Sequence, residues 1–523
     1  MLKFQVLLHI IGLPMTRQKK LYISSAVLSS LYLLEYFGLG ALIFENMFIT
    51  SPALPVLLSL VSVLPLTFSI LNITIFHRDG LSVGMICAAL AMALGYFLFA
   101  AYVLSKLTFL LITGMPVFAV LGITGLFLFL ILAYPKFGKR GRIITVSVLS
   151  VAIFCVCVFG ILRLAVFRFT SDGTVFAVED EYQIAWSTSV KSTGSVTVNG
   201  TTYYDESNGQ NRVSTLHKVS VPMSELDVAG GYTINSTPVY SEAAYLAIRG
   251  KQHSVRHAFR PADASDGLQI YNISDNHECL RGATAAGSYF GDKLDLLILN
   301  GDIINDVSSL WQISLIYKLA NNITGGERPV IYARGNHECN GKYADELPEY
   351  VGSSEGRLYY TVKLGNAFFL VLDTNNDMSD ANFLIRPAAN FELQRREQTE
   401  WLNSLDYFGE DCEYRFILAH MAFALADYER FPDWTEQLVG ATDGKFDLCI
   451  SGHSHVLDYA EAGAATRTDY PVIRGSHRSN RLEKGEGVSA GEFSGTAIEC
   501  SGGKVTAAFT NAKGEALQTI AVN

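Results

Sequence analysis

Five apolar stretches near the start of the chain restrict its fold more than any other feature. They cover residues 21–44, 53–76, 81–105, 107–134 and 143–167. Each reaches the ~20 residues that a helix needs to cross the hydrocarbon core of a bilayer. Helices of water-soluble domains average only about 10–14 residues, so buried helices are a poor explanation for five such stretches. We therefore predict an all-α membrane bundle of five helices over residues 1–170.

The basic residues around these stretches predict how the bundle is oriented. Lys3, Arg17, Lys19 and Lys20 precede the first stretch, and "PKFGKRGR" at 135–142 precedes the fifth. Basic residues favour the cytoplasmic side of a membrane. Since no small-residue cleavage site follows the first stretch, we expect a retained multi-pass anchor in the cell membrane. The N-terminus is then cytoplasmic, and everything after residue 167 is extracytoplasmic.

Charge separates the two parts of the chain. Residues 1–170 hold 12 of the 40 Lys and Arg residues but only 3 of the 50 Asp and Glu residues, which leaves 28 basic and 47 acidic residues outside. A strongly acidic surface repels polyanions, whereas nucleic-acid binding depends on a basic face. We expect no nucleic-acid partner. The oligomeric state is not predictable from these features.

In the extracytoplasmic part, residues 171–523, the hydrophobic pattern of the sequence changes near residue 262. Residues 171–261 carry short alternating runs such as "YQIAWSTS", "GSVTVNGTTYY" and "LHKVSVP", which predict a small antiparallel β-sandwich. From 262 to 523, apolar strands such as "LDLLILNGD" and "AFFLVLDT" alternate with helical stretches such as "SSLWQISLIYKLANN". This alternation predicts a layered α/β domain, which a C-terminal strand–turn–strand meander closes.

Polar residues with nitrogen or oxygen ligands follow five of these strands in succession. The strand ends read "ISDNH", "LNGDIIND", "RGNHE", "LAHMAF" and "SGHSH". In α/β sheets, functional groups gather at the carboxyl ends of the strands. The candidate ligands are Asp275, His277, Asp302, Asn336, His420, His453 and His455.

The spacing and number of these residues indicate a metal centre. In extended backbone, residues i and i+2 point to the same side, so Asp275 and His277 can converge on one place, as can His453 and His455. Glycines at 301, 335 and 452 allow sharp turns after the strands. Seven ligands are too many for one tetrahedral zinc but fit two metal ions that share a carboxylate. Mixed carboxylate and imidazole ligands favour Fe, Mn or Zn over Mg or Ca.

The ordered set D-x-H, GD, GNHE, lone His and GHxH resembles the calcineurin-like metallophosphoesterase superfamily. The resemblance implies that Asp275, His277 and His455 hold one metal and that Asn336, His420 and His453 hold the other. Asp302 would bridge the two ions. His337 would be catalytic, facing the phosphate outside the set of ligands. Arg334 resembles the phosphate-binding arginine of phosphoprotein phosphatases, although a surface salt bridge is an equally open interpretation.

The order of the two outer modules also resembles purple acid phosphatases. "STGSVTVNG", "FRPAD", "LYYTVKLGNAFFLVLDT" and "EQTEWLNSL" carry this likeness, which implies a fibronectin-like β-sandwich before the catalytic domain. Those enzymes have an iron-ligating tyrosine three residues after the bridging aspartate, where this chain has Asn305, and they lack the histidine present here as His277. In phosphoprotein phosphatases an aspartate at the Asn305 position supports the catalytic histidine, and Asp306 lies one residue away from it.

These features predict a membrane-anchored, dinuclear-metal phosphoesterase that uses metal-activated hydroxide. Its substrate is expected to be a phosphate monoester, with His337 donating a proton to the leaving oxygen. A phosphodiesterase that acts on nucleotides or lipid head groups shares the same motifs and stays open. So does a membrane sensor or transporter with an appended phosphatase-like domain. A disulfide between Cys279 and Cys339, each two residues after a site histidine, is a further open alternative.

Overall fold

The structure is a computed structural model that describes residues 166–243, 246–262, 267–382, 385, 388–475, 477–478 and 493–522. Four predicted membrane spans, 21–44, 53–76, 81–105 and 107–134, lie outside these residues, and so does the fifth, 143–167, except for its last two residues. No helix within the described ranges combines the length and apolar character needed to cross a bilayer. The membrane bundle over residues 1–170 therefore stays a prediction.

The described residues belong to two compact units. The smaller unit contains Val166 and Val239–Arg249, in which the end of β7 (Gly231–Ala243) pairs with β8 (Leu246–Arg249). The larger unit contains Phe167–Pro238 and Gly250–Asn523. Everything described below lies in the larger unit.

Antiparallel strands make up the first part of the larger unit. They are β1 (Phe169–Val178), β2 (Glu181–Val198), β3 (Thr201–Tyr204), β6 (Ser214–Pro222), the first part of β7, and β9 (His253–Ala258). A two-stranded ribbon, β4 (Glu206–Ser207) with β5 (Gln210–Asn211), and the short helix α7 (Met223–Ala229) complete it. Strand β1 also pairs in parallel with β12 (Pro329–Ala333) through Val175 and Phe176. One hydrogen-bonded sheet thus continues across the predicted boundary at 261/262, and the fibronectin-like sandwich stays a prediction.

The second part of the larger unit is a layered α/β fold. Its first sheet runs β22 (Ala516–Val522), β21 (Lys504–Asn511), β20 (Phe493–Ser501), β10 (Leu268–Ile273), β11 (Leu296–Asn300) and β12, with β19 (His477–Arg478) beside β20. The second sheet runs β13 (Tyr360–Leu364), β14 (Ala367–Leu372), β15 (Tyr414–Ala419), β16 (Leu448–Ser451), β18 (Val472–Arg474) and β17 (Asp458–Ala460). Strands β20, β21 and β22 pair antiparallel, as the sequence predicted for the closing meander.

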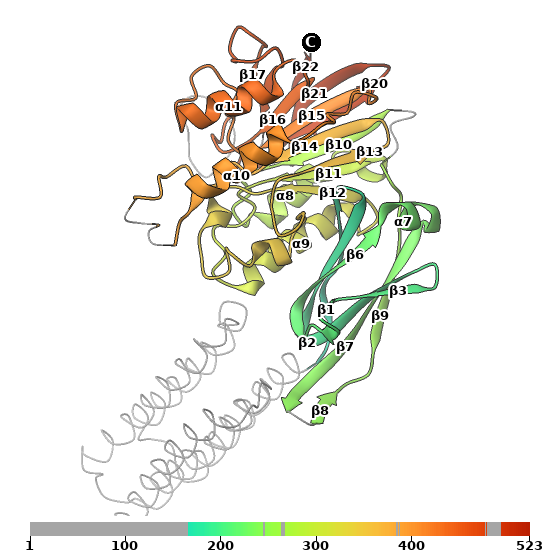
Figure 1. Cartoon of the computed structure of the whole chain (residues 1–523). Helices are drawn as coiled ribbons and strands as arrows, with labels where there is room; N and C mark the ends of the chain where they lie inside the picture. The colour runs from blue at the N-terminus through green and yellow to red at the C-terminus, as the bar shows by residue number, and fades with distance from the viewer. Residues whose placement is uncertain are drawn as a thin grey trace, which may run out of the picture. The chain divides into compact units, whose positions relative to one another are not determined.

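Helices cover the outer faces of the two sheets (Figure 1). Helices α8 (Leu280–Gly287) and α9 (Leu310–Thr324) pack on the first sheet, and α10 (Phe391–Asn403) and α11 (Pro432–Thr442) pack on the second. Three short 3₁₀ turns, at Gly291–Lys293, His337–Cys339 and Leu347–Glu349, lie in the loops. Helix α9 buries Ile313, Ile316, Tyr317 and Ala320 at helical spacing, and the Ser309 side chain caps its first turn.

Strand β11 shows why these elements assemble in layers. All five of its residues are buried. Because side chains alternate along a strand, Leu296 and Ile298 enter the core between the sheets, while Leu297 and Leu299 pack in the core beneath α8 and α9. A strand that is apolar on both faces is typical of the interior of such a layered fold.

Candidate metal centre

The strand order brings the predicted ligands to one place. Strands β10, β11 and β12 pair in parallel, and so do β14, β15 and β16. The carboxyl ends of parallel strands share one edge of their sheet, and every predicted ligand follows such an end. The first sheet supplies Asp275, His277, Asp302 and Asn336, and the second supplies His420, His453 and His455.

The backbone at five of the seven ligands is left-handed and not extended. The φ angles are 53° at Asp275, 44° at His277, 54° at Asp302, 66° at His453 and 55° at His455. Strands β10 and β16 end before these residues, so the expectation that extended backbone aligns residues i and i+2 is wrong. Positive φ is costly for residues with a side chain, and it persists where surrounding contacts enforce it, often at functional sites.

Three glycines make room for the ligand loops, and only one of them has a positive φ. Gly301 has a φ of 78°, and a Cβ there would lie 2.6 Å from His420 Nδ1. A Cβ on Gly335 would collide with Asp302, and one on Gly452 would collide with Ser274 and Asp275. Gly335 and Gly452 are thus explained by close approach of neighbouring loops rather than by the sharp turns that we expected.

The ligand atoms form three overlapping groups. Within each group they lie within 4.8 Å of one another, and the groups are Asp275–His277–His455, His277–Asp302–His337 and Asp302–His420–His453. His455 Nε2 lies 3.4 Å from Asp275 Oδ1 and 3.3 Å from His277 Nε2. Asp302 Oδ2 lies 3.3 Å from His420 Nε2 and 3.9 Å from His277 Nε2. Asp302 therefore lies between two pairs of histidines, His277 with His455 and His420 with His453.

Asn336 joins the group around His420. Its Oδ1 atom lies 2.9 Å from Nδ1 of His453. The first and third groups, with Asn336 added, contain the same residues as the two predicted ligand sets, and Asp302 is near both. The assignment of individual ions to these sets stays a prediction.

His420 gives the clearest indication that the cluster suits a metal ion. Its ring is fully buried, and Nδ1 donates to the carbonyl oxygen of Asn300 at 2.7 Å. This bond directs Nε2 toward Asp302, and Nε2 is among the buried polar atoms without a hydrogen-bond partner in the described part of the chain. Buried polar atoms are rarely left in that state, and imidazole ligands commonly donate their second nitrogen to a carbonyl. The donor set therefore fits a bound metal ion, and the expected choice among Fe, Mn and Zn stays a prediction.

The protonation of the cluster reflects burial and mutual charge. Burial acts to lower the pKa of His420, but the carboxylates of Asp302 and Asp275 outweigh it and raise that pKa to about 10. Burial acts to raise the pKa of Asp302, but His420 holds it well below its usual value. Both shifts have the same cause, which is the attraction between the His420 ring and the Asp302 carboxylate.

The pKa values of three further ligands, Asp275, His277 and His453, shift in the direction that burial favours. Burial raises the pKa of Asp275 to about 7, although the positive charge of His420 opposes the shift. Burial lowers the pKa values of His277 and His453 to about 4. Both imidazoles are therefore neutral at neutral pH, which is the form that binds metal.

His337 lies at the open side of the cluster. Its Nδ1 donates to the carbonyl oxygen of Asn305 at 2.8 Å, and its Nε2 lies 4.0 Å from Asp302 Oδ2. Its side chain is 40% exposed. Asp306, whose support for this histidine was left in doubt because it lies one residue from the expected position, accepts from Ser308 N and from the side chain of Gln312. The backbone carbonyl of Asn305 therefore orients the His337 ring.

The contacts of Arg334 do not fit the predicted contact with phosphate. Its guanidinium is buried and forms two hydrogen bonds to Asp373, from Nε at 3.1 Å and from Nη2 at 2.6 Å. It also lies over the ring of Phe391. Arg334 is thus held inside the protein, and the salt bridge that we considered as an alternative is a buried one.

Glu338 is a residue of the site to which the sequence analysis gave no role. Its fully buried carboxylate accepts hydrogen bonds from the backbone nitrogens of Asp302, Ile303, Ile304 and Gly335, at 2.7–3.1 Å. It thereby fixes the loop that follows β11 against the loop that follows β12. The only signal in the sequence was its place in the "GNHE" motif.

Cys279 and Cys339 are both free, so the disulfide considered between them is absent.

Comparisons with known proteins agree with this geometry. Residues 268–457 match the family model of calcineurin-like phosphoesterases, and this segment contains all seven predicted ligands and His337. The segment is therefore a metal-dependent phosphoesterase domain.

Two solved structures resemble the chain at low sequence identity. One is a purple acid phosphatase, PPD1, from yellow lupin (Lupinus luteus) seeds, with 12% identity, a TM-score of 0.44, and coverage of 67% of this chain and 73% of that one. The other is PhoD, with 13% identity, a TM-score of 0.39, and coverage of 68% and 90%, respectively. No curated protein matches the chain.

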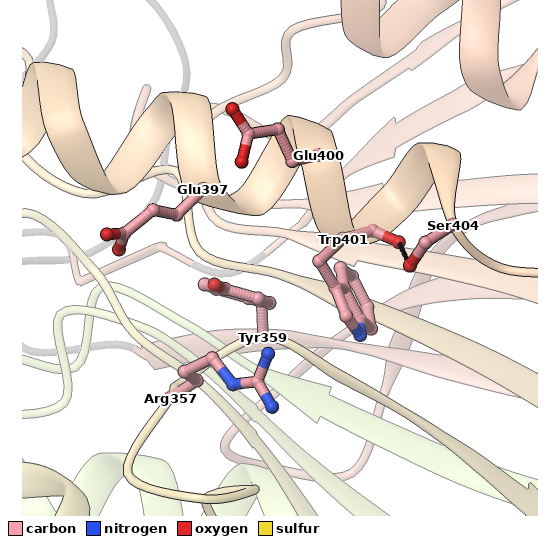
Figure 2. Close-up of a pocket in the computed structure, with 6 residues that line it drawn as sticks. All are labelled: Arg357, Tyr359, Glu397, Glu400, Trp401 and Ser404. Carbon is pink, nitrogen blue, oxygen red and sulfur yellow. Dashed lines mark hydrogen bonds between the residues drawn. The ribbon is translucent and has the colours of Figure 1, made fainter.

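A separate pocket lies beside α10 (Figure 2). It has a volume of about 390 Å³, and it is lined by Arg357, Tyr359, Glu397, Glu400, Trp401 and Ser404. The rings of Tyr359 and Trp401 lie 4.9 Å apart, and Arg357 is paired with Glu355. None of the predicted site residues lines this pocket, so it is distinct from the metal centre.

Proposed function

We propose that the chain is a membrane-anchored phosphoesterase that uses two metal ions to hydrolyse phosphate monoesters outside the cytoplasm. The observation that carries the proposal is the clustering of the seven ligand side chains, with Asp302 between groups that fit two ions. The domain class supplies the reaction type. The proposed N-terminal anchor rests on the five apolar stretches and their basic flanks, and the proposed fibronectin-like module spans residues 171–261.

The residues of the centre divide the work of binding and orientation. Asp275, His277 and His455 would hold one ion, and Asn336, His420 and His453 the other, with Asp302 shared. When bound, two such ions clamp the phosphate, lower the pKa of a water molecule and offset the negative charge that develops. Glu338 holds two of the ligand loops at a fixed separation, which keeps the ligands preorganised.

His337 is suited to move a proton at the mouth of the site. The bond from Nδ1 to Asn305 fixes the ring, so that Nε2 faces the ligand cluster. A protonated Nε2 can donate to the leaving oxygen of the ester, a contribution of roughly 10²–10⁴-fold in general acid catalysis. Its partly exposed position leaves room for a substrate.

A substrate panel with metal analysis tests the proposed reaction. The purified full-length chain would be assayed on alkyl and aryl phosphate monoesters, on phosphodiesters and on nucleotides, with metals measured on the same sample. We expect about two ions per chain and the highest kcat/KM on a monoester. A preference for diesters would refute the monoesterase assignment, and metal binding without turnover of any ester would indicate a binding module.

Protease accessibility tests the proposed topology separately. Protease added outside intact cells or spheroplasts should release an active fragment close in size to residues 171–523. Protection of that part, together with cleavage of the N-terminus, would overturn the extracytoplasmic location without affecting the proposed chemistry.

A further inference from the structure

The end of strand β14 supplies no predicted ligand, yet four consecutive polar residues there are almost completely buried. They are Asp373, Thr374, Asn375 and Asn376, and none of them is more than 1% exposed. Burying polar groups is unfavourable unless hydrogen bonds replace the lost water. Strand β14 pairs with β15, which precedes His420, so this segment lies among the ligand-bearing strand ends.

Two of these residues hold the loop that carries Asn336. Asp373 accepts both hydrogen bonds from Arg334, which lies two residues before Asn336. Asn376 Nδ2 lies 3.5 Å from Asn340 Oδ1, and Asn340 in turn donates to the backbone oxygen of Asn336 at 2.9 Å. The segment therefore contacts this loop on both sides of Asn336.

A third residue holds the backbone beside His420. The hydroxyl of Thr374 accepts from the backbone nitrogen of Met421 at 3.1 Å. Met421 directly follows His420 and is fully buried, so water cannot replace this acceptor. Asn300 holds Nδ1 of the His420 ring, and Thr374 holds the backbone next to His420. The His420 side chain is therefore fixed at both ends.

Helix α10 anchors the segment from behind. Gln398 accepts from the backbone nitrogen of Asp373 at 2.8 Å and donates to its backbone oxygen at 3.1 Å. Asn375 donates to Gln394 at 2.6 Å and accepts from Arg395 at 2.8 Å. The segment is thus a fixed support and not a free loop.

We infer that residues Asp373–Asn376 are positioning residues for Asn336 and His420, and that they set the affinity of the one metal site those two ligands build. The inference rests on the proposed function. The other site has a different support, because Asp275 accepts from the Ser274 hydroxyl at 2.6 Å and from the backbone of His453. Changes in the segment should therefore weaken one ion selectively.

The test compares Thr374→Val with Thr374→Ser in the full-length chain. Valine keeps the shape of threonine but removes the acceptor for Met421 N, whereas serine keeps the hydroxyl. Metal-free protein would be titrated with Zn²⁺ by calorimetry, and the bound zinc would be counted. We expect two sites in the wild type, one of them weakened about 10–100-fold in Thr374→Val, and wild-type behaviour in Thr374→Ser.

A second variant covers the case in which Thr374→Val does not fold. The double change Arg334→Met with Asp373→Leu removes both buried charges together, which proteins often tolerate. It should also weaken one zinc site and spare the other. Two wild-type affinities in a folded variant, or equal weakening of both sites with a lower Tm, would overturn the inference. A wild type that binds no zinc would instead refute the proposed function.

Discussion

The two halves of the metal centre are built from the same kinds of ligand but are enclosed very differently. His455 and His277 extend from left-handed loops, and the His455 side chain is 41% exposed. His420, in the other half, is completely buried and is backed by Asn300 and by the Thr374–Met421 contact. Left-handed backbone occurs in both halves, since His453 of the closed half also has a positive φ, so the halves differ in how deeply His420 and His455 are buried. Since outer partners orient ligands and tune metal affinity, we expect the closed half to bind its ion more tightly.

Replacing the residue that the two halves share should have the largest effect. Asp302→Ala removes the carboxylate whose Oδ2 atom lies 3.3 Å from His420 Nε2 and 3.9 Å from His277 Nε2, so we expect both ions to lose a ligand. Because two metals contribute several kcal/mol to the transition state, kcat/KM should fall at least about 10³-fold. The measurement is kcat/KM alongside metal content. Two ions retained in Asp302→Ala would show that the carboxylate does not bridge.

The next largest effect is expected for His337, which we propose to be a proton donor and not a ligand of either half. In His337→Ala, an alkyl phosphate should lose most of a 10²–10⁴-fold contribution, because its leaving group needs a proton. An activated aryl phosphate leaves readily as an anion and should lose much less. Metal content should stay near the wild-type value. Equal losses on both substrates, or the loss of one ion, would return His337 to a ligand or structural role.

The sequence indicated which residues meet but not how the chain holds them. The apolar runs and the "GNHE" and "GHSH" motifs are local patterns, so the strands and the residues at their ends could be predicted. The left-handed backbone at Asp275 and His453 depends on neighbouring loops that are distant in sequence. The same holds for the four backbone bonds to Glu338, for the pairing of Arg334 with Asp373, and for the pairing of β1 with β12. Those contacts join residues that no local pattern relates.

A matched pair of ligand variants compares the two halves directly. His420→Ala removes a ligand from the closed half, and His455→Ala removes one from the open half. Each should weaken one site, and in both variants the intact site serves as an internal reference. During stepwise chelation of the wild type, the ion of the open half should leave first, so His420→Ala should lose its last ion more easily than His455→Ala. The opposite order would show that burial does not decide affinity here.

Loading the protein with iron tests whether either half of the metal centre forms the coloured iron site of the purple acid phosphatases. That colour requires a tyrosinate on ferric iron, and the corresponding position here is Asn305. Iron-loaded protein should therefore show no strong visible band, whatever its activity. The measurement is a visible spectrum of protein that carries two irons per chain by metal analysis. An intense band would show that another tyrosine reaches one of the ions.

The smallest effect is expected at Asn305 itself. Its side chain is exposed, and it is the backbone oxygen that accepts from His337 Nδ1. Asn305→Ala keeps that oxygen, so the ring stays oriented and kcat/KM should change by no more than about twofold, as for surface substitutions generally. In phosphoprotein phosphatases, by contrast, the side chain of an aspartate at this position supports the catalytic histidine. Replacing that aspartate with alanine would therefore remove the support. If Asn305→Ala reproduces the selective loss on alkyl phosphates expected of His337→Ala, the side chain and not the carbonyl supports the proton donor.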